Sequence, residues 1–360
     1  MRILQVITDT DRRGAQVFAT DLSTAMSARG HEVETVALAP GAQSPGLDVA
    51  VLGERQRGIR TLRTLRRRMS SADITIAHGS STGLACALAG LGPGRPFVYR
   101  QISDTRFWAG SWPRRLRVAL YLRTAKTIVA LSPATRQAVH EHLWIPLERI
   151  FVVPNGVSAS VFRPPTDGER AAARTALDLP PDAFVALYIG ALVREKGIDI
   201  AIEAVGHLSG VTLAIAGGGP DQTRLHQLAD QVDDGRVKFL GTLDRPMDGY
   251  AAADVVVLPS LSESMPATLI EAGLCGLPVI ATDTGSVGKI VVDRQTGLLV
   301  PVGDGARLRR AIVDLLDDRE KRRSMGDAAR CHCLDRFEIE VVAAEWLAVL
   351  DPRIVAAVAR

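Results

Sequence analysis

The sequence predicts a protein of the α/β class with two domains, each built on a doubly wound parallel sheet. Three observations support this prediction. The 360 residues exceed what one domain usually holds and suit two. Hydrophobic residues make up 47% of the chain, which supplies enough apolar surface for two cores. Short apolar runs alternate along the whole chain with amphipathic segments of helix length, a pattern typical of βαβ units.

The first domain is expected over residues 1–163. Its apolar runs predict strands at 2–8, 32–38, 47–52, 73–77, 96–100, 126–131 and 149–153. The segments between them space their apolar residues as helices do, and they predict helices at 15–29, 57–70, 82–91, 112–124 and 133–142. Proline and glycine then cluster in Pro154-Asn155-Gly156 and Pro164-Pro165, which indicates a linker.

The second domain is expected over residues 164–335. Its strands are predicted at 183–189, 211–216, 236–240, 254–258, 278–281 and 297–300, with helices at 197–206, 220–232, 266–275 and 304–318. No strand follows the helical segments after residue 319, and residues 336–360 are predicted to form a helix that crosses back to the first domain. Two such sheets in tandem are expected to face an interdomain cleft, where the carboxyl ends of the strands would bind ligands.

The charge of the chain is divided unevenly along its length. Residues 1–163 carry 22 Lys and Arg against 11 Asp and Glu, whereas residues 164–360 carry 21 against 29. The two halves are therefore expected to face different partners. The four cysteines form no plausible disulfide framework, and no membrane span or cleavable signal peptide fits, so a cytoplasmic protein is predicted.

Two basic segments of the first domain carry apolar stripes at helical spacing. One surrounds Ile59, Leu62, Leu65 and Met69 with arginines, and the other, residues 108–121, adds the interfacial aromatics Trp108, Trp112 and Tyr121. Such a surface favours association with an anionic membrane surface, on the inner face of the membrane. The alternative is that both stripes face the core and the arginines are solvated. No base-reading motif accompanies the charge, so nucleic acid is not an expected partner.

Two glutamates flank the start of a predicted helix that follows the apolar run 255–258. Glu263 lies in the loop before this helix, and Glu271 lies about a turn and a half inside it. Their carboxylates can therefore reach opposite ends of one elongated ligand, and carboxylates accept hydrogen bonds from sugar hydroxyls.

The residues between the two glutamates suit the start of a helix. Pro266 fits the first turn, with Ser264 or Met265 at the cap. The free amides of Ala267 and Thr268 would then form an anion site for a diphosphate. Taken alone, the segment also fits an ordinary capped helix with a solvated Glu271.

At this point the chain resembles the retaining family 4 glycosyltransferases, whose two Rossmann-like domains form the arrangement called GT-B. Their signature is a pair of glutamates with seven residues between, as Glu263 and Glu271 stand here. The resemblance covers essentially the whole chain, through Arg13-Gly14-Ala15-Gln16, Pro154-Asn155-Gly156-Val157, Arg194-Glu195-Lys196-Gly197, Gly217-Gly218-Gly219-Pro220 and Thr296-Gly297-Leu298-Leu299-Val300. Several weak motifs in the family's order are jointly specific.

The resemblance implies catalytic roles for His78, Glu263 and Lys196. Glu263 would bind the donor hexose, Lys196 would neutralise the diphosphate, and His78 would lie near the donor sugar and the acceptor. It also implies that the donor nucleotide sugar is bound by Gly14, Gly190, Arg194, Lys196, Gly217, Met265, Pro266, Ala267, Thr268 and Glu271, with Glu271 on the ribose. The family arginine usually follows Gly190 directly, where this chain has Ala191, and Arg194 is the candidate substitute.

The predicted activity is therefore transfer of a hexose from a nucleotide diphosphate sugar, more commonly UDP than GDP in this family, to an acceptor hydroxyl with retention. The acceptor would be a sugar, a lipid-linked molecule or another small molecule. No cofactor and no metal are implied. Asp9-Thr10-Asp11 imitates a metal-binding DxD motif but stands earlier in the chain than that motif usually does.

Other readings of the sequence remain open. Gly79-Ser80-Ser81-Thr82-Gly83 fits the G-x-S-x-G of an α/β-hydrolase, with Ser81 as the nucleophile, but no oxyanion segment precedes it. Gly217-Gly218-Gly219 lacks the glycine order of a nicotinamide site. A sugar-nucleotide epimerase of the same fold, or a sugar-nucleotide binding protein without catalysis, would use the same donor residues.

Overall fold

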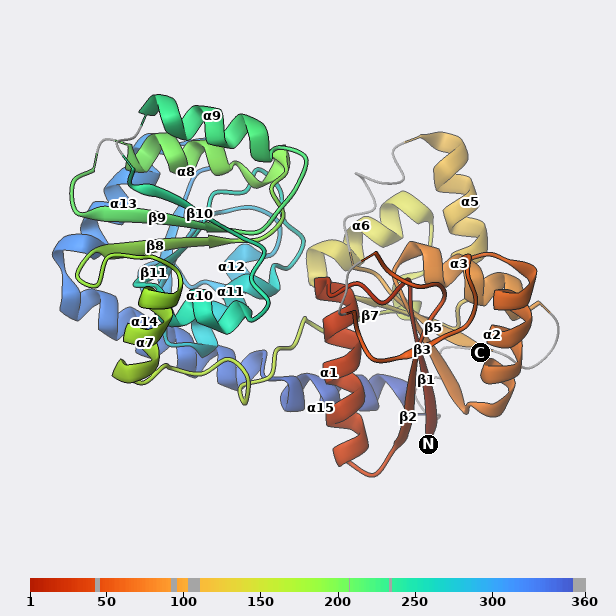
Figure 1. Cartoon of the computed structure of the whole chain (residues 1–360). Helices are drawn as coiled ribbons and strands as arrows, with labels where there is room; N and C mark the ends of the chain where they lie inside the picture. Colours follow the sequence, from red (N-terminus) through yellow and green to blue (C-terminus); the bar gives the residue numbers. More distant parts are fainter. Residues whose placement is uncertain (43–45, 92–95, 103–110, 207, 233–234, 352–360) are drawn as a thin grey trace. The chain divides into compact units, whose positions relative to one another are not determined.

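The structure, a computed structural model, describes residues 1–42, 46–91, 96–102, 111–206, 208–232 and 235–351. The chain divides into two compact units (Figure 1). Met1–Gly156 and the segment from Ile339 onward form the first unit, and Val157–Glu338 forms the second. These divisions differ from the expected ones, after residues 163 and 335. Each unit contains one parallel sheet with helices, so the prediction of two doubly wound α/β sheets is confirmed.

The first unit has a seven-stranded sheet in the order β3-β2-β1-β4-β5-β6-β7. All of its strand pairs are parallel. The strands are β1 (Arg2–Ile7), β2 (Glu32–Ala37), β3 (Ala50–Val51), β4 (Ile74–His78), β5 (Phe97–Arg100), β6 (Thr127–Ala130) and β7 (Ile150–Val152). Strands β4, β5 and β6 are almost wholly buried, as their mostly apolar composition predicts for a sheet covered on both faces.

Helices cover the two faces of this sheet in two separate layers. One face carries α1 (Gly14–Ala28) and α15 (Ile339–Leu350), whose Phe18, Leu22 and Trp346 share a core with Ile76 and Val98. The other face carries α2 (Ile59–Ser71), α3 (Ser80–Ala89), α5 (Trp112–Leu122) and α6 (Pro133–Leu143). The last helix of the described residues, α15, is therefore part of the first unit, where Arg29 of α1 also forms an ion pair with Glu340.

The second unit has a six-stranded parallel sheet in the order β10-β9-β8-β11-β12-β13. The strands are β8 (Phe184–Ile189), β9 (Val211–Ala216), β10 (Val237–Gly241), β11 (Val255–Leu258), β12 (Val279–Thr282) and β13 (Gly297–Val300). The helices are α7 (Asp167–Ala176), α8 (Ile198–Val205), α9 (Gln222–Val232), α10 (Pro246–Ala252), α11 (Ala267–Leu274), α12 (Val287–Ile290), α13 (Gly305–Asp317) and α14 (Arg319–Arg336).

In both sheets the chain adds its first three strands toward one edge and then places its fourth strand on the other side of the first. In the first unit the chain builds outward from β1 toward β3, then returns to place β4 on the other side of β1. In the second unit β8 and β11 are the equivalent neighbours. Loops that leave such a pair of strands diverge, and ligands of open parallel sheets bind at the crevice this creates.

A few elements differ from the sequence predictions. The strand expected at 47–52 is only Ala50–Val51, because it pairs with β2 alone at the edge of the sheet. The short helices α10 and α12 were not predicted, since seven and four residues are too few for a helical period to stand out. Among the described residues, no helix combines the length and the apolar composition that crossing a membrane requires.

Candidate functional site

The loops that follow β8, β9, β11 and β12 pack together at the carboxyl edge of the second sheet. The amide of Leu261, after β11, donates to the carbonyl of Glu195, after β8, at 2.8 Å. The amide of Leu192 donates to the carbonyl of Gly218, after β9, at 3.0 Å. The amide of Ser286, after β12, donates to the carbonyl of Ser264 at 3.1 Å. The segments that carry most of the predicted donor residues therefore form one continuous surface.

Lys196 and Glu263 meet at the β8–β11 switch point of this sheet. The Lys196 Nζ donates to Glu263 Oε1 at 2.6 Å, and the side chains are 25% and 7% exposed. The Ser260 hydroxyl, which is fully buried, donates to the same oxygen at 2.7 Å. A largely buried carboxylate is thus held by a cation and a hydroxyl, an arrangement that fixes its direction.

Glu271 lies on α11, the helix that follows this loop. The helix begins at Ala267, so Pro266 stands at the cap position and not in the first turn as predicted. The Tyr250 hydroxyl, on α10, donates to Glu271 Oε2 at 2.6 Å. The first-turn amides of α11, at Ala267 and Thr268, have no partner within their own helix. Ser260 and Tyr250 were missed from the sequence, since neither lies within a recognisable motif.

Glycines allow the loops to approach one another closely. Gly217 has φ +136°, and a Cβ added there would collide with the carbonyl oxygen of Gly190. A Cβ added at Gly285, φ +58°, would collide with the carbonyl oxygen of Glu263. Packing of the loops therefore already requires glycine at 217 and 285. The predicted donor contact of Gly217 remains a prediction beside this structural role.

The remaining predicted donor residues of the second unit differ in exposure. Arg194 and Ala191 are exposed and lie in the same loop after β8. The pKa of Asp221 is lowered, mainly by its hydrogen bond with Arg224 and in addition by the charge of Arg194. Met265 is 6% exposed, so its side chain is mostly covered by the protein. Arg194 is thus an exposed cation in the loop after β8, as its proposed role in place of the missing family arginine requires.

Gly14 is the first residue of α1, directly after the β1 loop of the first unit. An added Cβ would meet no atom within 4 Å, so the fold itself does not require glycine there. Arg13, the residue before Gly14, pairs with Asp9. Asp9 also accepts from Gln16 Nε2 at 3.1 Å. The first carboxylate of Asp9-Thr10-Asp11 is thus already bound within the protein.

His78 ends β4 and is buried, at 2% exposed. Its Nε2 lies 2.8 Å from Gln5 Oε1, and the Gln5 amide nitrogen donates to the carbonyl of Ala19, so Nε2 is the protonated nitrogen. Burial and the nearby Arg100 hold the His78 pKa well below its usual value. The ring is therefore neutral and turned to protein partners, and its role at the sugar stays a prediction.

The hydrolase reading does not match the geometry at Ser81. The left-handed residue after β4 is Gly79, φ +91°, and Ser81 lies inside α3. A hydrolase nucleophile would itself occupy the strained turn. The nearest histidine in sequence, His78, bonds Gln5 instead.

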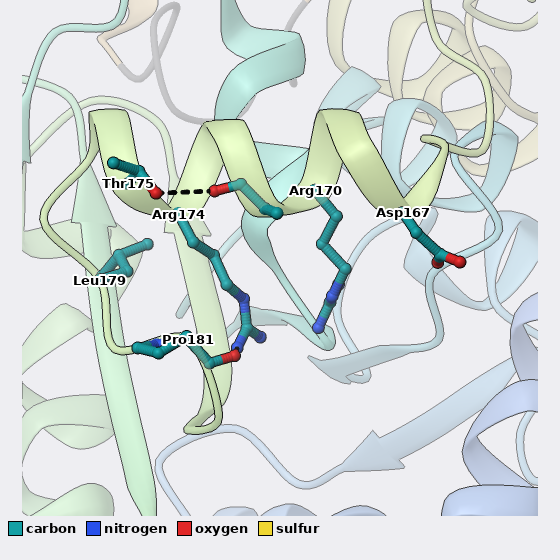
Figure 2. A pocket seen from close by; sticks show the side chains of 7 residues that line it. Asp167, Arg170, Arg174, Thr175, Leu179 and Pro181 are labelled. Carbon is teal, nitrogen blue, oxygen red and sulfur yellow. Dashed lines mark hydrogen bonds between the residues drawn. The ribbon is translucent and has the colours of Figure 1, made fainter.

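A pocket of about 290 Å³ lies on α7, at the opposite end of the second sheet (Figure 2). Arg170 and Arg174 line it, and both donate to Asp254, the residue before β11. Arg174 also donates to carbonyls of Ala252 and Ala183 at 3.0 Å each. These cations are committed to joining α7 to the amino ends of β8 and β11, so this pocket is not the candidate site.

Two family models match the chain, one for each half. The model described as Glycosyl transferases group 1 matches residues 169–332, and the model described as Glycosyltransferase Family 4 matches residues 12–161. Together with the two doubly wound sheets, these matches define a glycosyltransferase of the GT-B fold. The resemblance drawn from the sequence motifs is thereby confirmed.

The relatives agree with this class. The lipopolysaccharide core biosynthesis glycosyltransferase LpsE of Rhizobium meliloti is 30% identical over 242 residues, 67% of this chain and 68% of the relative. A D-inositol 3-phosphate glycosyltransferase of Xylanimonas cellulosilytica is 29% identical over 94% of this chain and 91% of the relative. The chain also matches a D-inositol 3-phosphate glycosyltransferase of Streptomyces bingchenggensis, and there it spans only 51% of the relative's length. This chain belongs to the group 1 glycosyltransferases.

A solved structure shares the fold over nearly the full length. Anabaena Alr3699/HepE, in complex with UDP-glucose, matches with a TM-score of 0.86 and 21% identity, covering 97% of this chain and 99% of that one. At this identity the likeness concerns the fold.

Proposed function

We propose that this glycosyltransferase moves a hexose from a UDP-hexose to an acceptor hydroxyl with retention at the anomeric carbon. The observation that carries the proposal is the contact between Lys196 and Glu263 at the switch point of the second sheet. A cation and a carboxylate held together suit a ligand with a diphosphate next to a polyhydroxylated ring. The HepE structure, which has the same fold, is in complex with UDP-glucose, and this supports UDP as the donor nucleotide.

Each proposed role follows from the chemistry of the side chain. Lys196 Nζ has three N–H donors, so it can hold Glu263 and a phosphate oxygen together. Charge on the leaving diphosphate grows in the transition state, and a fixed cation stabilises that state selectively. Glu263 would accept a hydrogen bond from a hexose hydroxyl, and Glu271 from the ribose. The amides at the start of α11 would bind the diphosphate.

The remaining groups complete the proposed reaction without a cofactor or a metal. Arg194 would supply the second positive charge beside Lys196, and Gly190 and Gly217 would let backbone approach the donor. The leaving diphosphate would take the proton of the acceptor hydroxyl. Gly14 and His78, at the switch point of the first sheet, would contact donor and acceptor from that unit.

A thermal-shift panel of nucleotides tests the donor. UDP and UDP-hexoses are expected to raise the melting temperature more than GDP or ADP at equal concentration. A ligand at 100 times its dissociation constant adds about 2.7 kcal/mol, which such a panel detects. A larger shift with GDP would overturn the choice of base, and no shift with any nucleotide sugar would overturn the donor site.

Replacing the two glutamates is expected to separate transfer from nucleotide binding. Glu263→Ala should lower the transfer rate about 10-fold to 100-fold, as a lost charge-assisted hydrogen bond predicts. Its affinity for UDP should be kept or increased, because Lys196 would no longer be neutralised by Glu263. Glu271→Ala should instead lower UDP affinity by at least tenfold. Calorimetric titration with UDP beside initial rates checks both, and equal loss of UDP affinity in both variants would contradict the division.

The acceptor proposed is anchored at an anionic membrane surface. The helices of one face of the first unit, α2, α3, α5 and α6, carry nine arginines and one glutamate. On α5 the spaced side chains of Trp112, Leu116 and Leu120 are exposed, Trp112 at 64%. On α2, by contrast, Leu65 and Met69 are buried, which agrees with the alternative that this stripe faces the core. Ile59 of the same helix is exposed. Trp108 lies outside the described residues.

Exposed apolar side chains among arginines are typical of surfaces that bind anionic lipid. The name of the relative LpsE, a lipopolysaccharide core enzyme, agrees with an acceptor of that kind. Membrane association would then be peripheral, on the cytoplasmic face.

Liposome sedimentation tests this surface. The protein is expected to sediment with vesicles containing phosphatidylglycerol at low salt, and to do so less at high salt. The triple change of Arg60, Arg63 and Arg67 to Glu should abolish sedimentation, since these three arginines are exposed, whereas Arg66 bonds the Leu91 carbonyl at 2.6 Å. The same charge change at Arg310, Arg319 and Arg323 of the second unit is the matched control. No sedimentation of the wild type, or equal loss in both triples, would remove the membrane proposal.

A further inference from the structure

Tyr250 is a buried tyrosine whose hydroxyl points to one of the proposed donor residues. It lies on α10, a helix absent from the sequence prediction, and its side chain is fully buried. The hydroxyl lies 2.6 Å from Glu271 Oε2 and 3.3 Å from the carbonyl of Thr268. A phenol has one proton to donate, and the shorter bond to the charged oxygen is the stronger of the two.

The ring of Tyr250 is fixed from another side by aromatic packing. Phe162 meets it edge to face, with ring centroids 5.6 Å apart and planes at 83°. Burial and the Glu271 charge raise the pKa of Tyr250 well above its usual value, so the hydroxyl stays protonated and remains a donor. The position of the hydroxyl therefore depends on a rigid ring and not on a flexible chain.

The Glu271 side chain has three rotatable bonds, and the residue is half-buried in the middle of α11. A carboxylate that samples several rotamers loses entropy when it binds a diol, whereas one already held in place loses less. A hydrogen bond from a rigid neighbour thus improves the affinity for the diol without touching it.

We infer that Tyr250 is a positioning residue, which holds Glu271 in the orientation that accepts hydrogen bonds from the two ribose hydroxyls of the donor nucleotide. This inference rests on the proposed donor site. Tyr250 lies outside the glutamate motif and on a different helix from Glu271. Its hydroxyl is expected to affect recognition of the ribose alone.

The test compares UDP with 2′,3′-dideoxyuridine 5′-diphosphate, which lacks both ribose hydroxyls, by calorimetric titration. The wild type is expected to prefer UDP. Tyr250→Phe keeps the ring, and it should lower the affinity for UDP about tenfold while leaving the affinity for the dideoxy ligand unchanged. In a Glu271→Ala background, Tyr250→Phe should have no further effect on UDP affinity, as for two residues that act as a unit.

Tyr99→Phe, a hydroxyl deletion at a buried tyrosine of the first unit, is the matched control and should bind both ligands as the wild type does. Should Tyr250→Phe not fold, 3,5-difluorotyrosine at position 250 keeps ring and hydroxyl but is more acidic. Its preference for UDP should then disappear as the pH rises through the phenol pKa, while that of the wild type persists.

The outcomes separate this inference from the proposed donor site. Failure of the wild type to bind UDP or GDP would overturn the donor site itself. If the wild type prefers UDP over the dideoxy ligand but Tyr250→Phe loses affinity for both ligands equally, Tyr250 has a structural role and the inference is overturned. Retention of the full preference by Tyr250→Phe would overturn it as well.

Discussion

Replacing Lys196 with alanine is expected to lower the transfer rate by about 10²-fold to 10³-fold, the effect seen when one preorganised donor to a developing negative charge is removed. Lys196 is suited to this role because its Nζ is fixed by Glu263 at 2.6 Å, so it need not reorganise as the diphosphate leaves. The loss should appear mainly in kcat, with a smaller weakening of UDP binding, since charge on the diphosphate is larger in the transition state than in the donor.

The matched control for this change is Lys238→Ala, in β10 of the same unit. Lys238 pairs at 3.4 Å with Asp178, whose side chain is 98% exposed, and such surface pairs contribute little. Lys238→Ala should therefore keep its rate and its UDP affinity. Initial rates with a saturating UDP-hexose, beside titration with UDP, check both variants. A folded Lys196→Ala protein with more than a tenth of the wild-type rate would contradict the leaving-group role.

The two sheets could be predicted from the sequence because their evidence is local. Strands such as Val255–Leu258 are continuous apolar runs, and a fully buried parallel strand must be apolar on both faces. The edge strand at Ala50–Val51 has only one neighbour and less need of that composition, so its length was overestimated. The short helix α10 contains Gly249 and spans too few residues to show a period.

The residues of the candidate site could be predicted, but their mutual contacts could not. Lys196 and Glu263 are 67 positions apart, and only the order of the strands brings their loops together. The partners Ser260 and Tyr250 carry no motif, since a single buried hydroxyl leaves no pattern in a sequence. Burial of His78 depends on Gln5 and Arg100, from two other strands, and the spacing around His78 does not reveal it.

The division of the apolar residues on α5 shows the same limit. Its sequence has apolar residues on two sides of the helix, and periodicity does not say which side meets the sheet. In the structure Val118, Ala119 and Leu122 are buried, whereas Trp112 and Leu120 face outward. Of the two predicted stripes, the one on α2 packs in the core, so the apolar part of the proposed lipid-binding surface rests on α5 and α2 contributes its exposed arginines.

The largest effect on stability is expected at Asp254, far from the donor site. Its carboxylate accepts from Arg170 at 2.7 Å, from Arg174 at 2.8 Å and from the amide of Val185 at 2.8 Å. The Arg174 side chain is 6% exposed, so Asp254→Ala would leave a buried guanidinium without its counterion. Breaking a buried pair in this way costs about 3–5 kcal/mol.

Thermal unfolding of the purified protein measures this effect, with added UDP used to mark the transition of the second unit. Asp254→Ala should lower that transition strongly, and Asp254→Asn should lower it less, because the amide oxygen still accepts one hydrogen bond. Asp178→Ala, at a carboxylate that is 98% exposed, is the control and should change stability by less than about 0.5 kcal/mol. A loss below about 1 kcal/mol in Asp254→Ala would mean that the two arginines find other partners, and that α7 does not depend on this carboxylate to join the strands.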